Sequence, residues 1–203
     1  MIARHVTTPK LRELHSLLWR WTGLISTTAR QWVAEKDCLW WYTERALVST
    51  LAAAAWLDGG QALEEYSNEK GRGRRNYPGR CDLYLYTGSE EFVAEAKLRW
   101  CNVGRGSREG IDGVRDQLAA ACDDARLLKG YGARRLGMVF AVPRYPASQQ
   151  TAGHRLLSEW QARLAGIRAG GLAWSFPLAA RELQWKSHAY PGVAVVVREV
   201  GRG

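Results

Sequence analysis

A regular alternation of apolar and polar residues runs through positions 80–100, RCDLYLYTGSEEFVAEAKLRW. Alternation with a period of two is typical of β-strands whose two faces meet different surroundings. The middle of the stretch holds Gly88-Ser89, and a two-residue turn of type II′ takes glycine at its first central position. The stretch therefore predicts two antiparallel strands in which Asp82 lies opposite Glu95.

This register separates the side chains of the hairpin into two faces. The apolar face carries Cys81, Leu83, Leu85, Phe92, Ala94, Ala96 and Leu98. The other face carries Asp82, Tyr84, Tyr86, Glu91, Val93, Glu95 and Lys97. A slip of one residue would bury the charged side chains, so the pattern also fixes the register.

The rest of the chain alternates between helical and strand-like segments. The expected order is helices at 10–33 and 38–57, a Gly- and Arg-rich loop at 66–80, the hairpin, a helix at 111–129, a buried central strand at 135–143, a helix at 148–168, and strands at 172–178 and 192–200. This order predicts the α/β class, with a mixed central sheet flanked by helices. We expect a single domain, divided into an N-terminal helical extension (1–37), a core (38–145) and a C-terminal part with a helix and strands (146–203).

The charge balance narrows the class of partner. Lys and Arg number 29 against 20 Asp and Glu, which gives a net charge of +9. An excess of this size favours a polyanionic partner, either nucleic acid or an anionic membrane surface. The four cysteines form no Cys-x-x-Cys pair, which favours free thiols over a zinc site or a disulfide framework.

The sequence carries no recognisable targeting or membrane signal. Its first residues, MIARHVTTPK, have no apolar signal core, and the longest run of low polarity, ALVSTLAAAAWL, is too short to span a bilayer. We therefore expect a cytoplasmic protein with reduced cysteines and no membrane partner.

Two carboxylates directly across a hairpin repel each other. The Cβ atoms of Asp82 and Glu95 would lie about 5 Å apart, where like charges are destabilising. A cation between the carboxylates, or a raised pKa on one of them, would relieve the repulsion. Mg²⁺ or Mn²⁺ fits because these ions prefer carboxylate oxygens, and Lys97 on the same face would lie beside the ion. The alternative is a solvated face, on which Asp82 pairs with Arg80 and Glu95 pairs with Lys97.

Two polar residues fall inside the apolar stripes of helices. Glu44 lies in the stripe of the helix at 38–57, where a carboxylate is costly unless it is paired or binds a metal ion. Gln117 lies in the stripe of the helix at 111–129. Structural alternatives are open for both: Glu44 at the edge of its stripe reaching water, and Gln117 bonded to neighbouring backbone.

Together these residues resemble the PD-(D/E)xK nuclease superfamily, over positions 40–142. The resemblance implies a restriction-endonuclease-like core of a helix, a three-stranded meander, a helix and a strand, with an extra N-terminal helix. The first strand of the meander would then lie within 60–79. The motif aspartate would be Asp82, and the E-x-K motif would be Glu95-Ala96-Lys97, with the Ala96 carbonyl also facing the metal ion.

The helical residues extend this resemblance. The family's helix-borne acid would be Glu44, with Glu64 and Glu65 as alternative carriers. DQLAAACDDARLL is similar to the motif of the RecB-like branch, in which a helical Gln precedes a Tyr by four residues. Gln117 matches that Gln, whereas Ala121 stands in the place of the Tyr.

The resemblance implies a Mg²⁺- or Mn²⁺-dependent deoxyribonuclease, which serves defence, repair or a mobile element. Asp82 and Glu95 would hold the metal ion, and Glu44 would support the ion or its water. Lys97 would polarise the reacting groups, and Gln117 would orient them.

Basic residues flank these candidate site residues. Those expected to bind nucleic acid are Lys70, Arg72, Arg74, Arg75 and Arg80 in the loop, with Arg99 and Arg105 after the E-x-K motif. Arginine and lysine there would hold the phosphates on either side of the cut, a contact that does not depend on base sequence. The alternative is a solvated loop without a ligand.

Other functions are compatible with the same sequence. The fold could bind nucleic acid or protein without turnover, or the chain could be a toxin or defence subunit that needs a partner. The N-terminal helix, PKLRELHSLLWRWTGLI, would either dock such a partner or a second copy, or pack on its own core. DNA is the expected substrate, and RNA stays open.

Overall fold

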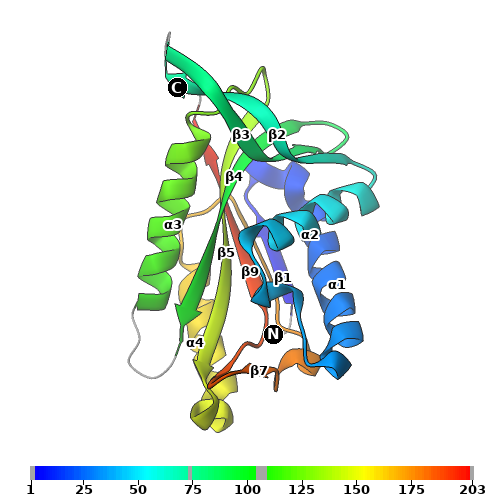
Figure 1. Ribbon diagram of the computed structural model, residues 1–203, viewed down its shortest axis with the longest axis vertical. Coiled ribbons are helices and arrows are strands. Elements are labelled where there is room, and N and C mark those ends of the chain that lie inside the picture. The colour runs from blue at the N-terminus through cyan, green and yellow to red at the C-terminus, as the bar shows by residue number, and fades with distance from the viewer. Residues whose placement is uncertain (1–2, 73–74, 104–108, 202–203) are drawn as a thin grey trace.

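The computed structural model describes residues 3–72, 75–103 and 109–201. They form a mixed sheet with helices on both faces, so the predicted α/β class is confirmed (Figure 1). In sheet order the strands are β1 (Ala3–Thr7), β6 (Gly171–Ser175), β9 (Val193–Val200), β5 (Arg134–Pro146), β4 (Glu91–Asn102), β3 (Arg75–Tyr86) and β2 (Gln61–Arg72). Two short strands, β7 (Gln184–Trp185) and β8 (His188–Ala189), pair with each other and with the end of β5.

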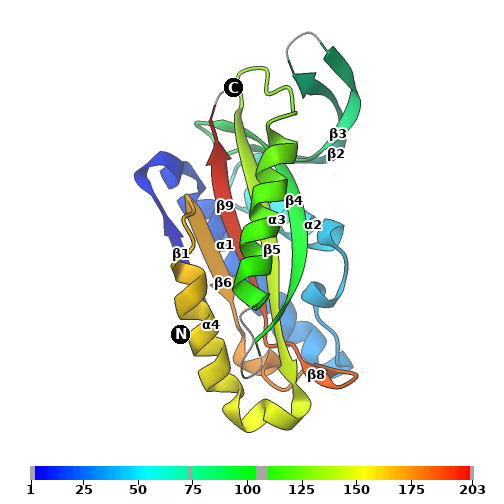
Figure 2. The ribbon, with the colours of Figure 1, turned by 90° about the vertical axis from the view of Figure 1, so that its left-hand side faces the viewer.

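Two helices pack on each face of the sheet (Figure 2). One face is covered by α1 (His15–Trp32) and α2 (Glu44–Leu57), and the other by α3 (Glu109–Ala125) and α4 (Gly153–Ala165). Single 3₁₀ segments lie at η1 (Pro9–Leu14), η2 (Val33–Glu35), η3 (Leu39–Trp41), η4 (Ala147–Ala152) and η5 (Leu178–Ala180).

Strand β5 lies at the centre of the sheet and is buried on both faces. Met138 and Phe140 face the core under α1 and α2, whereas Val139 and Ala141 face the core under α3 and α4. Alternation between two apolar layers explains why this strand has a nearly continuous apolar sequence. The predicted buried central strand is confirmed.

The predicted hairpin is present as β3 and β4 in the predicted register. Leu83 pairs with Ala94 and Leu85 with Phe92. The Thr87 N–H donates to the Glu90 carbonyl at 3.0 Å, and Gly88 has φ +86°, a conformation that glycine adopts without strain. The alternating pattern and the Gly-Ser turn together therefore determine the register.

Beyond Leu83 and Ala94 the two strands of this hairpin separate, so the prediction that Asp82 lies directly opposite Glu95 is wrong. Strand β3 continues against β2 as a long antiparallel pair, whereas β4 continues in parallel with β5. Cys81 consequently leaves the apolar face predicted for it and packs against Val93 and Leu128. The separation leaves one edge of β4 without a partner strand among the described residues from Glu95 onward.

The prediction of a loop at 66–80 is wrong, because its described residues, 66–72 and 75–80, belong to β2 and β3. Gly71, Pro78 and Gly79 suggest a break in the pattern, but an antiparallel ladder runs through all three. The segment after α3 supports the ladder from the side, since Gly71 N–H donates to the Leu127 carbonyl at 2.8 Å. A first strand within 60–79, which the resemblance implies, is therefore present as β2.

The N-terminal helix packs on the sheet of its own chain. Its apolar residues, Leu11, Leu14, Leu18, Trp21 and Ile25, are each 0–1% exposed. Of the two alternatives for this helix, packing on its own core is confirmed. The apolar stripe is therefore not free to dock a partner or a second copy.

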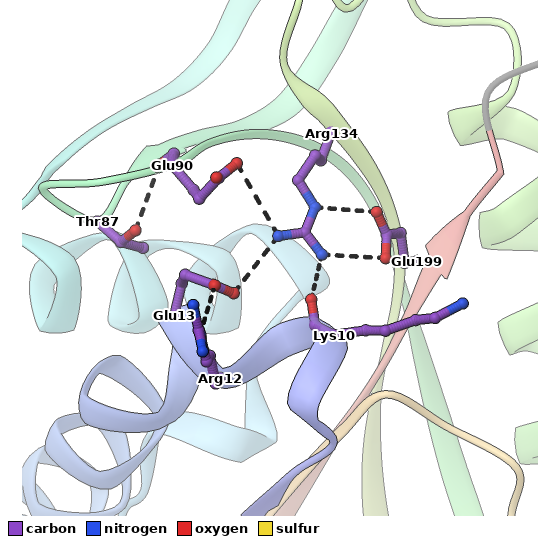
Figure 3. A network of polar contacts seen from close by, with 7 residues as sticks. All are labelled: Lys10, Arg12, Glu13, Thr87, Glu90, Arg134 and Glu199. Carbon is purple, nitrogen blue, oxygen red and sulfur yellow. Dashed lines mark hydrogen bonds and ion pairs between the residues drawn. The ribbon is translucent and has the colours of Figure 1, made fainter.

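An arginine network ties this N-terminal part to the core (Figure 3). Arg134, the first residue of β5, binds both carboxylate oxygens of Glu199 on β9, at 2.9 and 3.0 Å. The same guanidinium lies 3.4 Å from a Glu13 oxygen and donates to the Lys10 carbonyl. Glu90, in the turn before β4, lies 3.9 Å away and completes the ring of acceptors.

All four cysteines are buried free thiols, as expected. Within the residues that the structure covers, no helix combines the length and the apolar character needed to cross a membrane.

Candidate active site

The unpaired edge of β4 is capped by two carboxylates that come from different elements. The Ala96 N–H donates to Asp82 Oδ2 at 2.8 Å, and the Leu98 backbone lies close enough to the Glu44 carboxylate to act against the rise of its pKa. These two backbone groups would pair with a neighbouring strand if β3 stayed paired with β4 beyond Leu83 and Ala94. The separation of β3 from β4 therefore positions Asp82 and Glu44 side by side along one edge.

Glu44 is the first residue of α2, because Thr43 before it is extended and only a short 3₁₀ turn precedes it. The predicted helix at 38–57 therefore begins later than expected. A helix N-terminus favours a carboxylate, since its first N–H groups are unpaired. Burial nevertheless raises the pKa of Glu44, and the charge of Asp82 raises it further.

Of the alternative acids, Glu64 and Glu65 lie on β2 and have other partners. Glu64 accepts a hydrogen bond from the Ser49 hydroxyl. Glu65 is 3.0 Å from Arg45 in an ion pair. Glu44 is therefore the acid that reaches the edge of β4, and it does so from a helix.

Glu95 lies inside the protein, only 3% exposed, and the Lys70 ammonium is 2.9 Å from its Oε1. Burial raises the pKa of Glu95 to about 7, although Lys70 and Lys97 act against it, and Asp82 adds to the rise. The stem of Lys70 crosses over Gly79, where a Cβ would fall 2.8 Å from Lys70 Cγ. Glycine at this position therefore lets Lys70 reach Glu95.

Lys97 follows on the same face of β4 and binds Asp124 of α3 at 2.8 Å. Burial acts to lower the pKa of Lys97, but the hydrogen bond and charge of Asp124 outweigh it, so the pKa is raised and the ammonium stays charged. Neither Glu95 nor Lys97 has the partner expected on a solvated face, and Glu95 is buried. The solvated alternative is therefore wrong.

Asp124 is a site residue that the sequence reasoning missed. It lies seven residues after Gln117 and so on the same face of α3, about 10 Å further along the helix axis. This spacing of seven residues from Gln117 is the sequence signal that could have identified Asp124. Gln117 is half-buried, and its predicted role in orienting the reacting groups stays a prediction.

Ala96 is buried between the neighbouring motif residues, and its N–H faces Asp82. The N–H and C=O of one residue in a strand point to the same edge. We therefore expect the Ala96 carbonyl to face the edge that Asp82 and Glu44 cap, as the resemblance implies.

The basic residues predicted to bind nucleic acid divide into three groups. Lys70 and Arg80 are engaged with acids, Lys70 with Glu95 and Arg80 with Glu65 at 3.4 Å. Arg99 is half-buried against α3, where a Cβ on Gly113 would fall 2.5 Å from its Nε. The side chains of Arg72 and Arg75, at the end of the β2–β3 hairpin, and all of Arg74 and Arg105 lie outside what the structure describes.

The donor set is suited to a hard divalent cation. Mg²⁺ prefers oxygen ligands and keeps several waters, so one or two carboxylates are enough. Asp82 and Glu95 provide two, and Glu44 is close enough to both Asp82 and Lys97 for their charges to change its pKa. Among the residues that the structure covers, no three His, Cys, Asp or Glu side chains gather closely enough to hold a metal ion on their own.

Comparison with known proteins does not assign this chain to a family. A function for the chain rests on the residues and contacts described above. Comparison with family models, with curated proteins and with solved structures gives no match.

Proposed function

We propose that this chain is a metal-dependent nuclease that hydrolyses phosphodiester bonds in DNA. The observation that carries the proposal is the convergence of Asp82 and Glu44 on the free edge of β4, beside the buried Glu95 and the charged Lys97. The charge of Asp82 raises the pKa of both Glu44 and Glu95, and a bound cation would relieve this repulsion.

The side chains divide the work as follows. Asp82 and Glu95 would hold Mg²⁺ or Mn²⁺, with Glu44 in support. When bound, such an ion polarises a phosphate oxygen and lowers the pKa of a water molecule. Lys97, fixed by Asp124, holds a positive charge where negative charge develops on the phosphate.

DNA as the substrate is supported by charge. The chain carries a net charge of +9, and the sequence from 70 to 80 holds five Lys or Arg and no Asp or Glu. The first of these residues, Lys70, contacts Glu95. Lys70 would leave Glu95 when a divalent cation takes its place, and its ammonium would then be free to meet a phosphate oxygen.

The first test is Lys97→Ala. We expect this variant to lower the rate of Mg²⁺- or Mn²⁺-dependent DNA cleavage about 100-fold or more, because the charge facing the phosphate is lost. Cleavage is measured on plasmid and oligonucleotide DNA with and without chelator. Lys10→Ala, which removes an exposed ammonium in η1, should cleave like the wild type.

Calorimetry with Mn²⁺ gives a second readout that does not depend on turnover. Lys97→Ala should still take up the ion, whereas Asp82→Asn should bind it much more weakly. Undiminished cleavage by Lys97→Ala, or no uptake of Mn²⁺ by the wild type, would rule out the proposal.

A second candidate function is nucleic-acid binding without turnover. The observation that favours it is the Lys70–Glu95 ion pair, which already neutralises the buried carboxylate without a metal ion. The same assay separates the two functions. DNA that is retarded in a gel but stays uncut with either metal ion would favour binding alone.

A further inference from the structure

A groove of about 660 Å³ lies between the β2–β3 hairpin and the segment that follows α3. Its walls come from β2, β3, the start of β4 and residues 129–131. This volume is in the range of sites that enclose small organic groups.

The walls of the groove are fixed by hydrogen bonds before any ligand arrives. The Asn68 side chain, 8% exposed, donates to the Lys129 carbonyl at 3.2 Å and accepts from the Lys129 N–H at 3.1 Å. The Lys129 N–H also lies 2.9 Å from the Glu69 carbonyl. A groove whose walls are already fixed loses less conformational entropy on binding a ligand than a mobile loop does.

Four tyrosines line this groove. Tyr66 and Tyr84 pack edge to face, with ring centroids 6.4 Å apart, and form a rigid base. Tyr77 and Tyr131 stand at the rim and are 50% and 79% exposed. Exposed rings beside a framed groove are suited to stacking on another planar ring.

Tyr131 is held in an unusual backbone conformation. Its φ is +47°, in the left-handed region that bulky side chains rarely adopt, and it lies between Gly130 and Gly132. Such a conformation costs about 1–3 kcal/mol and is often found at ligand sites. The turn therefore presents the ring to solvent at a cost in stability, which points to a ligand.

The groove is continuous with the candidate active site. Glu69 lines the groove, and the next residue, Lys70, contacts Glu95. On β4, Val93 lines the groove, and Glu95 follows two residues later on the same face. Residues two apart in a strand are about 7 Å apart, so a ligand in the groove would lie next to the carboxylates.

We infer that the groove receives an unpaired base of single-stranded DNA, while the adjoining phosphodiester lies at Asp82 and Glu95. This inference rests on the proposed function and names its substrate class. A paired base cannot enter, because its faces are stacked on neighbouring bases and its edge is engaged. An unpaired base presents a free face that a tyrosine ring can cover whatever the base sequence.

The test is DNA binding by the full chain in the presence of chelator, so that no cleavage occurs. Fluorescence anisotropy compares a short labelled single strand with the same sequence as a duplex. The groove variant combines Tyr77→Thr, which suits a strand, with Tyr131→Gly, which suits the positive φ. The control is Trp19→Ala, an exposed ring on α1, which covers the opposite face of the sheet.

We expect the wild type and Trp19→Ala to bind the single strand about tenfold or more tightly than the duplex. The groove variant should lose this preference by weakening single-strand binding about tenfold or more. Crosslinking of an iodouracil-labelled strand should mark residues within 63–84 or 129–131. Equal or tighter duplex binding by the wild type, or unchanged single-strand binding by a folded groove variant, would overturn the inference.

Failure of this inference can be told apart from failure of the proposed function. If the wild type and the groove variant cleave duplex DNA equally well with metal ions, the nuclease function is supported and the role of the groove is contradicted. If the wild type binds single strands selectively but does not cleave DNA, and the groove variant loses that binding, the role of the groove is supported and the nuclease function is contradicted.

Discussion

A single buried carboxylate couples the chemistry of this molecule to its stability. Burial raises the pKa of Glu95 from 4.5 to about 7. Between these values the folded state keeps a proton on Glu95 that the unfolded state has released. The free energy of unfolding therefore falls as pH rises through this window.

This sign gives a direct prediction for Glu95→Gln. Wild-type protein should lose about 3 kcal/mol more of its unfolding free energy between about pH 4.5 and about pH 8 than the variant does, because the amide has no proton to release. Urea denaturation at several pH values measures the difference. Glu35→Gln, at an exposed position, should follow the wild type, and equal pH slopes for wild type and Glu95→Gln would contradict the assigned cause.

The residues that sequence reasoning found differ in kind from those it missed. Asp82, Glu95 and Lys97 could be found because alternation along two strands fixes which side chains share a face. Lys70 and Asp124 were not assigned their partners, because each reaches the site across a gap that depends on how β2 and α3 lie against β4. Spacing along a chain does not determine such distances.

At the scale of elements, glycine decides how closely a helix approaches the sheet. Gly137 on β5 lies directly under α3, where a Cβ would fall 2.6 Å from both the backbone nitrogen and the Sγ of Cys122. The backbone of α3 cannot move aside as the end of a flexible side chain can. The contact at Gly137 therefore sets the distance between α3 and β5.

We expect Gly137→Ala to lower the free energy of unfolding by about 1–3 kcal/mol or more, through overpacking. Gly23→Ala makes the same chemical change inside α1, where nothing lies within 4 Å of the new Cβ. It should instead raise stability by about 0.5–1 kcal/mol, since alanine favours helix. Urea denaturation of both variants tests the pair, and destabilisation of similar size in both would disprove this role of Gly137.

Elements with a strong local pattern were predicted from the sequence, and those held by distant contacts were not. The hairpin and the central strand β5 have periodic apolar residues and turn signals of their own. The outer part of β2 and β3 has glycine and proline where a sequence pattern suggests a loop, and the segment after α3 supports it. Strand β1 is five residues long and is defined by its pairing with β6.

At the scale of the molecule, Arg134 joins parts of the chain that are far apart in sequence. Its guanidinium contacts η1, the turn before β4 and the end of β9, and its side chain is only 18% exposed (Figure 3). Several acids share this one cation, so its removal would leave them close together without compensation.

Arg134→Ala should therefore lower the free energy of unfolding by about 2–4 kcal/mol. Amide hydrogen exchange in residues 3–14 should also become faster, since the N-terminal part loses its tie to the core. Arg155→Ala breaks an exposed pair with Glu159 and should cost about 0.5 kcal/mol or less. An equal decrease in unfolding free energy in the two variants would show that the Arg134 network contributes no more than an exposed ion pair.

The unpaired edge of β4 also affects how copies of this chain behave toward one another. An open strand edge is a template on which another chain can add a strand, the first step of aggregation. Here Asp82 occupies the Ala96 donor that such a strand would need, and Glu44 lies beside the Leu98 backbone. The two acids therefore help to keep the protein soluble. A variant that lacks both acids would become more prone to aggregation and would also lose any activity.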